Sequence, residues 1–358
     1  MNDSVNQRLR YVLDIHFDHK TGSPYWLEKQ KHLDLNVRKE IRTIDDLFRL
    51  GAMDENALAN RPIEDFIPRR FSNCTEYFIA ETAGTLGRPK STVHRHDEFH
   101  LAFVEPFIKA AQRCNFPTGG HWLFIGPTGP HIIGQAAQAC ARAMGSGDIF
   151  RVDFDPRWAK ALLPGSFAAK RYLRHIERQA QDILEVQNIV VLFSTPAVLE
   201  NLSENLTPEK RQKILGIHLG GLAASNEFMS KIADSFPKAV ILSGYGNTLF
   251  GMMPQLHYDS RTGFEYFPLG NRLVAQVIQE PEDTFEVNLA KTAEYEQRGR
   301  IVMHRLDEFQ LILNMVERDT AIRIHPPQHI KENGFILDGI RDPKPIVNEV
   351  TKVSLGLY

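Results

Sequence analysis

The feature that most constrains the fold is an alternation, beginning near residue 76, between apolar runs of strand length and longer amphipathic segments. Short buried strands joined by helical crossovers are typical of a parallel sheet covered by helices. The expected strands are residues 77–80, 121–125, 189–193, 214–219 and 239–243. The expected helices are residues 98–113, 132–144, 164–185 and 224–236. The pattern therefore predicts an α/β fold.

The first part of the chain has a different pattern. Residues 1–75 read as short helices and turns, whose apolar side chains are spaced to pack against a larger body. The chain has 358 residues, of which 42% are apolar, so it can bury a large core and exceeds the usual size of one domain. We therefore expect two closely packed subdomains, with residues 1–75 as a helical N-terminal region on the core.

Charge and cysteine content exclude several classes of protein. The net charge is −2 and the basic residues are scattered, so the basic patch of a nucleic-acid binder is missing. No apolar run approaches the ~20 residues that span a bilayer, and residues 1–10 lack the apolar core of a signal peptide. The three cysteines, Cys74, Cys114 and Cys140, are too far apart for a zinc site and favour buried free thiols. We expect a cytoplasmic protein without membrane or nucleic-acid partners.

Each expected strand is followed by a polar or glycine-rich turn. In an α/β fold the carboxyl ends of the strands are where ligands bind. The candidate loops are residues 126–131, 194–196, 220–221 and 244–248. One such loop would be ordinary, but four in series indicate a binding site along one edge of the sheet.

A further loop, residues 81–92, combines two glycines, several hydroxyls and two basic side chains. Glycines let backbone N–H groups turn toward an anion, and Lys90 or Arg88 adds charge, so the loop suits phosphates. It is not a Walker A loop, because Pro89 separates Gly87 from Lys90, and no kinase motif set accompanies it. A plain Gly/Pro surface turn is the alternative.

Taken in order, these stretches resemble the adenylate-forming enzymes, the acyl-CoA synthetase superfamily, over residues 60–342. Residues 82–90 are similar to the Gly-Thr-Thr-Gly-x-Pro-Lys phosphate loop, although Ala83 and Leu86 stand where that family usually has hydroxyls. Residues 124–131 resemble the acyl-pocket stretch of the phenylacetate-CoA ligase branch, and residues 245–248 its Tyr-Gly-x-Ser/Thr motif. In size the chain is similar to the acyl-protein synthetase of bacterial luminescence.

The resemblance implies a fold and a reaction. The fold is the large N-terminal domain of these enzymes, with stacked αβ subdomains and a small β subdomain, and residues 76–342 are its AMP-binding adenylation domain. The reaction is ATP-dependent activation of a carboxylic acid to an acyl-adenylate, with release of pyrophosphate. The acyl group then passes to coenzyme A, a carrier protein, an amine or a protein cysteine. The residues leave the acid and the acceptor open.

The resemblance also assigns residues. Lys90, Thr85 and Thr248 are the catalytic candidates. The ATP-binding candidates are Thr82, Gly84, Thr85, Gly87, Lys90, Gly220, Gly221, Tyr245, Gly246, Asn247, Thr248, Asp319 and Arg341. The acid-binding candidates are Phe124, Gly126, Thr128, Gly129, His131, Ser194, Thr195 and Pro196.

The chemistry of individual side chains agrees with these roles. Tyr245 offers an aromatic face for adenine, and Asp319 offers two acceptor oxygens for the ribose hydroxyls. Each also has a structural interpretation: a tyrosine after a buried strand is often an edge residue of the core, and an aspartate before a threonine is often a turn or cap. His131 is equally compatible with a substrate contact and with a satisfied loop histidine.

Two departures from the family pattern qualify the expected activity. Leu249 occupies the place of the usual acidic residue, so we expect Mg²⁺ to be held by ATP phosphates and water or by another carboxylate, with no protein metal site. The sequence ends at Tyr358, and on the resemblance residues 343–358 are a remnant after a hinge at Arg341, without the full mobile C-terminal domain. A partner protein would then complete the reaction.

Two other interpretations remain at this point. The departures favour a non-catalytic nucleotide- or acyl-adenylate-binding subunit of a multiprotein complex as the alternative function. The cluster of metal-type residues at 94–100 is better explained by Asp97 capping a helix than by a metal site.

Overall fold

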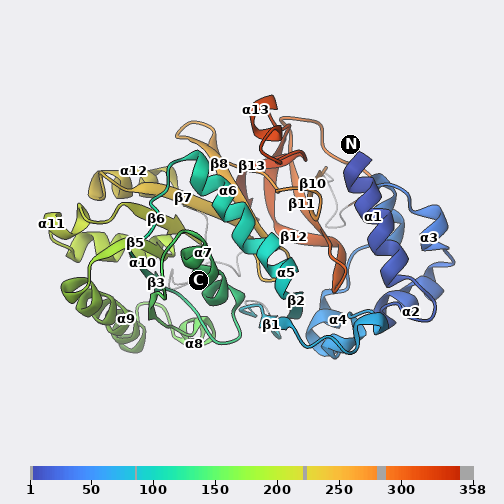
Figure 1. The fold of residues 1–358 in the computed structure, drawn as a ribbon, viewed down its shortest axis with the longest axis horizontal. Coiled ribbons are helices and arrows are strands. Elements are labelled where there is room, and N and C mark those ends of the chain that lie inside the picture. Colours follow the sequence, from blue (N-terminus) through green and yellow to red (C-terminus); the bar gives the residue numbers. More distant parts are fainter. Residues whose placement is uncertain (1–2, 85–86, 221–223, 280–287, 347–358) are drawn as a thin grey trace. The chain divides into compact units, whose positions relative to one another are not determined.

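The computed structural model describes residues 3–84, 87–220, 224–279 and 288–346 (Figure 1). The chain divides into two compact units. One, called here the parallel unit, comprises Glu81–Gly87, His100–Thr248 and Val347–Tyr358; the other, the antiparallel unit, comprises Met1–Ala80, Arg88–Phe99 and Leu249–Ile346. Of the expected C-terminal remnant, residues 347–358 lie outside the described residues.

The parallel unit is built on five strands in the order β4-β3-β5-β6-β7, each paired in parallel with the next. The strands are β3 (His121–Ile125), β4 (Phe150–Val152), β5 (Ile189–Ser194), β6 (Gly216–Leu219) and β7 (Val240–Asn247). All four residues of β6 and five of the six in β5 are buried. Burial on both faces is typical of parallel strands and explains their nearly continuous apolar sequences.

Helices cover both faces of this sheet (Figure 1). They are η4 (His100–Val104), α6 (Glu105–Arg113), α7 (Ile132–Ala143), α8 (Pro156–Ala161), α9 (Phe167–Val186), α10 (Pro196–Asn205), α11 (Pro208–Arg211) and α12 (Asn226–Ser235). From β3 the chain passes through α7 to β4, which lies at the edge of the sheet. From β4 it passes through α9 to β5, on the other side of β3, so it crosses the sheet in the opposite direction. Right-handed crossovers therefore place α7 on one face and α9, with its neighbours α10 and α12, on the other.

The antiparallel unit carries six strands in the order β10-β11-β12-β13-β9-β8. They are β8 (Gly251–Asp259), β9 (Gly263–Tyr266), β10 (Leu273–Ile278), β11 (Arg298–Leu306), β12 (Leu311–Ile324) and β13 (Gly339–Pro345). Neighbouring strands in this order run antiparallel, with Leu273 opposite Arg305 and Leu306 opposite Leu311. Two shorter strands, β1 (Tyr77–Glu81) and β2 (Ser91–Arg95), form a separate two-stranded sheet.

The N-terminal region packs on the strands of the antiparallel unit. Its elements are α1 (Asp3–His16), α2 (Pro24–Leu33), α3 (Val37–Glu40), η1 (Ile44–Leu50), α4 (Glu55–Asn60), η2 (Ile63–Asp65) and η3 (Arg69–Phe71), and the unit also contains α5 (His96–Phe99) and α13 (Gln328–Lys331). The Trp26 indole donates to the Leu311 carbonyl at 3.1 Å, and His16 Nε2 lies 3.0 Å from the Asp307 carbonyl. The Asn314 amide donates to the Leu47 carbonyl at 2.6 Å. These bonds fasten the region to β12 and to the turn before it.

A buried ionic network lies beneath that turn. Arg305 is fully buried and donates to the Asp307 carboxylate at 2.5 Å, to the Val93 carbonyl at 2.7 Å and to the Leu249 carbonyl at 3.1 Å. Arg272 donates to both oxygens of Asp307, at 2.8 and 2.5 Å. Although burial opposes it, the two guanidinium charges hold the pKa of Asp307 below its ordinary value. This network ties β2, β11 and the residue after the Tyr245–Thr248 motif into one core.

The α/β class predicted from the sequence is confirmed, and four of the five expected strands lie in the parallel sheet. The boundaries differ in places. The strand expected to end at Ser243 continues through Asn247, and the turn expected at Ser194–Pro196 instead opens helix α10. The helix expected over residues 98–113 is broken by the π-helical turn η4, and helix α5 begins one residue before Asp97, the expected cap.

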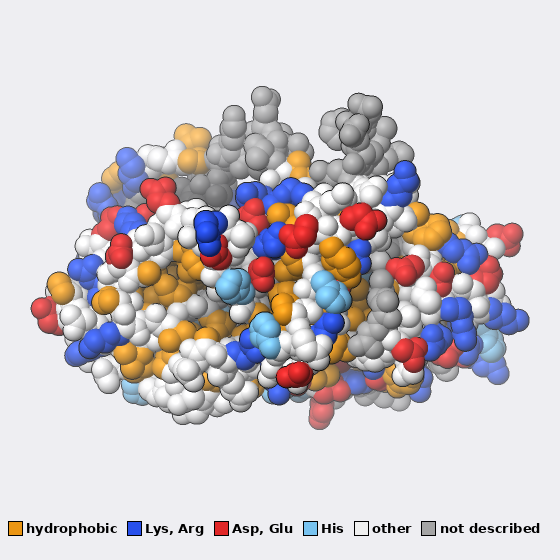
Figure 2. Space-filling model, turned by 90° about the horizontal axis from the view of Figure 1, so that it is seen from above, with side chains coloured by type: hydrophobic (Ala, Val, Ile, Leu, Met, Phe, Trp, Pro, Cys, Tyr) orange, Lys and Arg blue, Asp and Glu red, His pale blue; other side chains and the backbone are white. Residues whose placement is uncertain are grey.

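The surface of the protein is charged, and its cysteines are unpaired. On the face shown in Figure 2, acidic and basic side chains are interspersed. The three cysteines are free thiols, but only Cys140 is buried, and Cys114 is exposed, so the expectation of buried thiols is wrong for Cys114. Within the described ranges, no helix has the length and apolar character needed to cross a membrane.

Candidate active site

The topology of the parallel unit creates a switch point between β3 and β5. The chain leaves β3 for a helix on one face of the sheet and leaves β5 for a helix on the other, so a crevice opens at the carboxyl ends of these strands. A cavity of about 10 Å³ lies there, lined by Phe124, Gly126, Phe193, Ser194, Thr195 and Gly220. Of the residues predicted to hold the acid, Phe124, Gly126, Ser194 and Thr195 line this cavity. The other four, Thr128, Gly129, His131 and Pro196, are not among its lining residues.

The two hydroxyl residues after β5 have different roles. Ser194 Oγ donates to the Ile125 carbonyl at 2.7 Å, which fastens the end of β5 to the end of β3. Thr195 is only 3% exposed, yet its Oγ1 has no hydrogen-bond partner among the residues that the structure describes. Leaving a buried hydroxyl unpaired costs about 1–3 kcal/mol, so such a group in a native protein indicates a missing partner. Thr195, which also lines the cavity, is therefore the residue most suited to meet a ligand.

The glycine-rich loop after β3 is held by groups outside the predicted site. The backbone N–H and the hydroxyl of Thr128 both donate to Asp153, at 2.7 and 2.9 Å. The N–H of Glu81 donates to the Pro130 carbonyl at 2.8 Å, and Glu81 also pairs with Arg157. Gly129 has φ +61°, a left-handed conformation that favours glycine. Thr128 therefore shapes the loop with its hydroxyl.

His131 ends this loop at the N-cap position of α7 and is almost completely buried. Burial, and then the positive charge of Arg157, lower the pKa of His131. The imidazole is consequently neutral at pH 7.

Aromatic rings fill the floor of the cavity. The rings of Phe124 and Phe193 pack edge to face, with their centroids 5.3 Å apart. The rings of Phe193 and His218 also pack edge to face, with their centroids 4.3 Å apart. A Cβ on Gly126 would lie 2.5 Å from the Phe124 ring, so only glycine allows this packing. Burial lowers the pKa of His218 to about 4. The cavity has room for roughly one water.

The remaining candidates of the parallel unit lie around the ends of β1, β6 and β7. Gly84 follows β1 and has φ +64°, as an anion-binding loop requires, while Thr82 is partly buried beside it. Tyr245, Gly246 and Asn247 are the last three residues of β7, and Thr248 follows the strand. Thr85 and Gly221 lie outside the described residues.

Three predicted nucleotide residues belong to the antiparallel unit. Lys90 forms an ion pair with Glu55 and its side chain is 22% exposed, so it is not the freely exposed lysine that a loop position suggests. Asp319 lies in β12 opposite Pro345. Arg341, the predicted hinge residue, lies inside strand β13. Its guanidinium forms ion pairs with Glu296 and, at 3.8 Å, with Glu265.

The donor set for a metal ion is poor. Leu249 is buried, and its side chain lies in the core of the antiparallel unit while its carbonyl accepts from Arg305. In the described part of the chain, no three or more His, Cys, Asp or Glu side chains are arranged to hold a metal. Asp97, within the candidate cluster at 94–100, instead accepts two hydrogen bonds from Arg95, at 2.6 and 2.7 Å.

Comparison with solved structures identifies the fold. A 2-hydroxyisobutyryl-CoA ligase, solved with 2-HIB-AMP and CoA, superposes with a TM-score of 0.67 at 15% identity over 95% of this chain and 66% of the ligase. The same ligase in its postadenylation state with R3-HIB-AMP gives a TM-score of 0.67 at 14% identity over 94% of this chain and 65% of the ligase. The fold is that of the N-terminal domain of adenylate-forming enzymes. The chain spans about two thirds of the ligase's length.

No family model and no curated protein sequence matches this chain. The structural likeness, which covers most of the chain at low identity, thus shows the fold and leaves the family and the activity to be proposed.

Sequence reasoning missed the supports of the site. Asp153 was not noticed because β4, which precedes it, has only three residues and gives no periodic signal. Glu55, the partner of Lys90, is 35 positions away in the sequence, and no local pattern links the two. The unpaired state of Thr195 could only emerge once its neighbours were known.

Proposed function

We propose that the protein is an ATP-dependent acid ligase that forms an acyl-adenylate. The observation that carries the proposal is the cavity at the β3–β5 switch point, where the unpaired Thr195 hydroxyl lies between two loops of an adenylate-forming fold. The site residues named from the sequence are kept as proposals, with residues 76–342 as the adenylation domain and residues 1–75 as a helical region on it.

In the proposed reaction a carboxylate oxygen of the acid attacks the α-phosphorus of ATP. A P–O bond forms, the bond to the β-phosphate breaks, and pyrophosphate leaves with the electron pair. A thiol or amine then attacks the acyl carbonyl and AMP leaves. The protein contributes by holding carboxylate and phosphate in line and by directing donors toward the developing charge.

Individual residues take defined parts in this scheme. Thr195 Oγ1 donates to an oxygen of the acid or of its adenylate, which satisfies its hydrogen-bonding capacity on binding. Neutral His131, held at the start of α7, accepts or donates one hydrogen bond without adding charge. Tyr245 offers its ring to adenine, and Thr82 and Gly84 contact phosphate. We assign no step to Mg²⁺ and keep the prediction that it arrives on the ATP phosphates.

The proposal extends to the substrate class. We propose short or flat acids rather than fatty acids as substrates, because the cavity is small. From the resemblance of residues 124–131 we keep the proposal that the protein belongs to the phenylacetate-CoA ligase-like branch, and we also keep the proposal of a cytoplasmic location. The acyl acceptor is coenzyme A, a carrier protein, an amine or a cysteine of a partner protein.

Acid-dependent exchange of labelled pyrophosphate into ATP is the decisive experiment. The panel includes phenylacetate, benzoate, 2-hydroxyisobutyrate and a long-chain fatty acid, each with the full chain and Mg²⁺. We expect exchange with at least one short or aromatic acid. ATP binding without exchange for every acid would instead support the alternative, a non-catalytic nucleotide-binding subunit, which the buried Leu249 and the narrow cavity favour.

The Lys90–Glu55 pair permits a second test of the proposal. If Lys90 serves the triphosphate, Lys90→Ala raises the KM for ATP, whereas Glu55→Ala leaves the lysine charged and does not raise it. If the pair is only structural, both variants lower stability by a similar small amount, up to about 1 kcal/mol, and neither changes the KM. ATP titrations of the exchange rate, with urea unfolding of both variants, decide between the two roles.

A further inference from the structure

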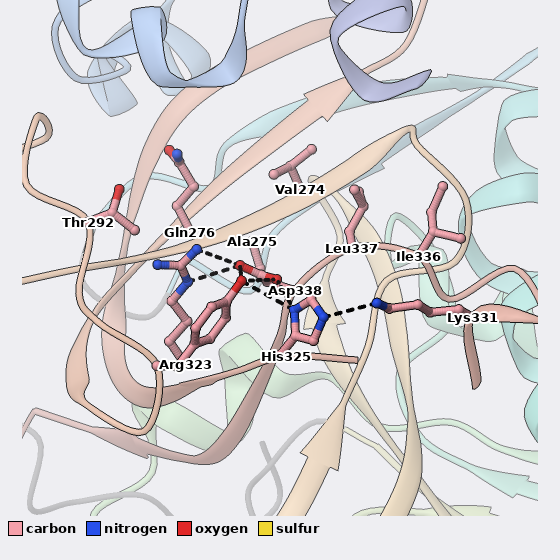
Figure 3. Close-up of a pocket in the computed structure, with 11 residues that line it drawn as sticks. Val274, Ala275, Gln276, Thr292, Arg323, His325, Lys331, Ile336, Leu337 and Asp338 are labelled. Carbon is pink, nitrogen blue, oxygen red and sulfur yellow. Dashed lines mark hydrogen bonds and ion pairs between the residues drawn. The ribbon is translucent and has the colours of Figure 1, made fainter. Parts of the chain in front are cut away.

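The antiparallel unit contains a second and larger cavity. Its volume is about 380 Å³, within the range of roughly 300–1,000 Å³ that small-molecule sites occupy. One side is β10 and another is the end of β12 with the segment that leads into β13 (Figure 3). The lining residues are all distinct from those of the cavity at Thr195.

One part of the lining is apolar. Val274 and Ala275 of β10 and Leu337 are buried, and Ile336 adds a further aliphatic side chain. Val274 and Ala275 are neighbours in a strand, so their side chains point to opposite faces and one of the two residues lines the cavity through its backbone. The remaining aliphatic side chains offer a surface that a flat or branched hydrocarbon group can cover, and burial of that group provides binding energy in proportion to its apolar area.

The other part is a chain of polar contacts. Lys331 Nζ lies 2.9 Å from His325 Nε2, His325 Nδ1 lies 3.3 Å from the Tyr295 hydroxyl, and that hydroxyl donates to Asp338 at 3.1 Å (Figure 3). An ammonium group can only donate, so His325 Nε2 accepts and its proton is on Nδ1.

Arg323 makes the polar part rigid without being available to a ligand. Its Nε and Nη2 donate to Asp338 Oδ2 at 2.9 and 2.7 Å, and its Nη1 donates to the Ala293 carbonyl at 2.8 Å. The guanidinium carbon also lies 4.3 Å from the centre of the Tyr295 ring. Such a stacked, bidentate arginine fixes both Asp338 and Tyr295 in place.

The charges of the cavity do not cancel. Arg323 and Asp338 form an ion pair with each other, which leaves the ammonium of Lys331 beside His325. Among the residues that the structure describes, no carboxylate forms an ion pair with Lys331. One positive charge at the edge of an apolar surface is the complement of a monoanion with an apolar body.

We propose that this cavity binds a small organic carboxylate, with the carboxylate at Lys331 and His325 and the apolar body against Val274, Ala275, Ile336 and Leu337. The single net charge favours a carboxylate over a doubly charged phosphate. The site does not depend on the ligase reaction, since none of its residues has a part in the proposed chemistry. It gives the protein a second place at which an organic acid binds.

The test is a titration of the full chain carrying ¹³C in the histidine ring, in which the His325 signal is assigned by its loss in His325→Gln. The probes are 2-naphthoate, the neutral 2-naphthalenemethanol and 2-naphthyl phosphate, which share one apolar body. We expect a saturable shift of the His325 signal with 2-naphthoate and weaker binding of both other probes. Equal binding of the alcohol, tighter binding of the phosphate, or the lack of a saturable shift would overturn the proposal.

A matched pair of lysine variants completes the test. Lys331→Gln should weaken 2-naphthoate binding about ten- to hundredfold, because it removes a charge-assisted hydrogen bond. Lys344→Gln, which removes a lysine with a 63% exposed side chain from β13, should leave it unchanged. Unchanged binding in a folded Lys331→Gln would contradict the proposal. Thr195→Val should not alter the His325 titration, so failure of the ligase proposal and failure of this one are separate outcomes.

Discussion

Two buried polar clusters of this protein differ in how completely their hydrogen bonds are made. In the antiparallel unit, all three nitrogens of the Arg305 guanidinium donate to carboxylate, hydroxyl or carbonyl oxygens. In the parallel unit, Thr195 Oγ1 and His218 Nδ1 have no partner within the described residues. The satisfied guanidinium of Arg305 is explained by stability, whereas the unpaired Thr195 hydroxyl, which lines the cavity at the end of β5, is the group that our proposal assigns to a ligand.

The largest effect is expected from breaking the complete cluster. Arg305→Met leaves Asp307 with one cationic partner and frees the Val93 and Leu249 carbonyls, so the free energy of unfolding should fall by about 3–5 kcal/mol. Urea unfolding followed by circular dichroism measures it. Arg261→Met, at a site with an 89% exposed side chain, is the control and should change stability by less than about 0.5 kcal/mol. A loss below about 1 kcal/mol in Arg305→Met would mean that the network is not a stabilising one.

The second effect concerns Glu98, a carboxyl group beside the Arg305–Asp307 network that has only one of its two oxygens hydrogen-bonded among the described residues. Glu98 Oε1 accepts from the backbone N–H groups of Glu308 and Phe309, but Oε2 has no partner in the described structure. Burial, and then the negative charge of Asp307, raise the pKa of Glu98 to about 7. The native state therefore retains a proton that the unfolded state releases near the ordinary glutamate pKa of 4.5. The stability it contributes is complete below that value and is lost as the pH rises through about 7.

Glu98→Gln, which keeps the Oε1 acceptor and cannot ionise, isolates this contribution. The stability of the variant relative to the wild type should rise by about 2–3 kcal/mol between pH 5 and pH 8. Burial lowers the pKa values of His16 and His304 to about 3, so these two residues make the native state more stable as the pH rises. Their contribution is the same in the variant and in the wild type and cancels in the comparison. Parallel stability–pH curves for the two proteins would refute the assigned pKa.

The third effect tests the unpaired cluster. Thr195→Val keeps the shape of the side chain and removes the unpaired hydroxyl, so the free energy of unfolding should stay equal or rise by up to about 1 kcal/mol. The rate of acid-dependent pyrophosphate exchange should fall about ten- to hundredfold, because the hydroxyl bonds only to substrate. Thr195→Ser, which keeps the hydroxyl, should retain most of the exchange. Full exchange in the valine variant would remove Thr195 from the site.

The smallest effect is expected one residue earlier. Ser194→Ala removes the bond to the Ile125 carbonyl and should lower the free energy of unfolding by about 1 kcal/mol, with less loss of exchange than in Thr195→Val. Urea unfolding and the exchange assay on the same preparation compare the two neighbours. If Ser194→Ala lost more exchange than Thr195→Val, the assignment of structural and substrate roles would have to be reversed.

The parallel unit could be predicted from the sequence because its strands are apolar on both faces. Residues 121–125 and 189–193 stand out as uninterrupted runs, and both match strands to within one residue. The antiparallel strands were not individually recognised, since β12 mixes buried and exposed positions without strict alternation, partly because β11 and β12 slip in register. Helix α10 was missed because Pro196 suggested a turn, whereas proline is also favoured in the first turn of a helix.

The candidate site was predictable as a set of loops but not as a set of contacts. Strand ends and glycines identify the loops at 126–131 and 194–196, because their positions follow from the order of the elements. Which hydroxyl is paired depends on neighbours such as Ile125 and Asp153, which lie far away in the sequence. Leu249 was noticed as a departure, but its burial beside Arg305 depends on the tertiary structure.

The attachment of the N-terminal region to β12 also affects how the chain folds during synthesis. Trp26 and Leu47 are made early, but their partners Leu311 and Asn314 are separated from them by 285 and 267 positions. At about 5–20 residues per second, a ribosome needs roughly 15–60 s to reach those partners. In that interval the indole of Trp26 has the rings of Phe17 and Tyr25 beside it, but its N–H lacks the Leu311 carbonyl. The hydrogen bonds that fasten Trp26 and Leu47 to β12 therefore form only after the ribosome has made nearly all of the antiparallel unit.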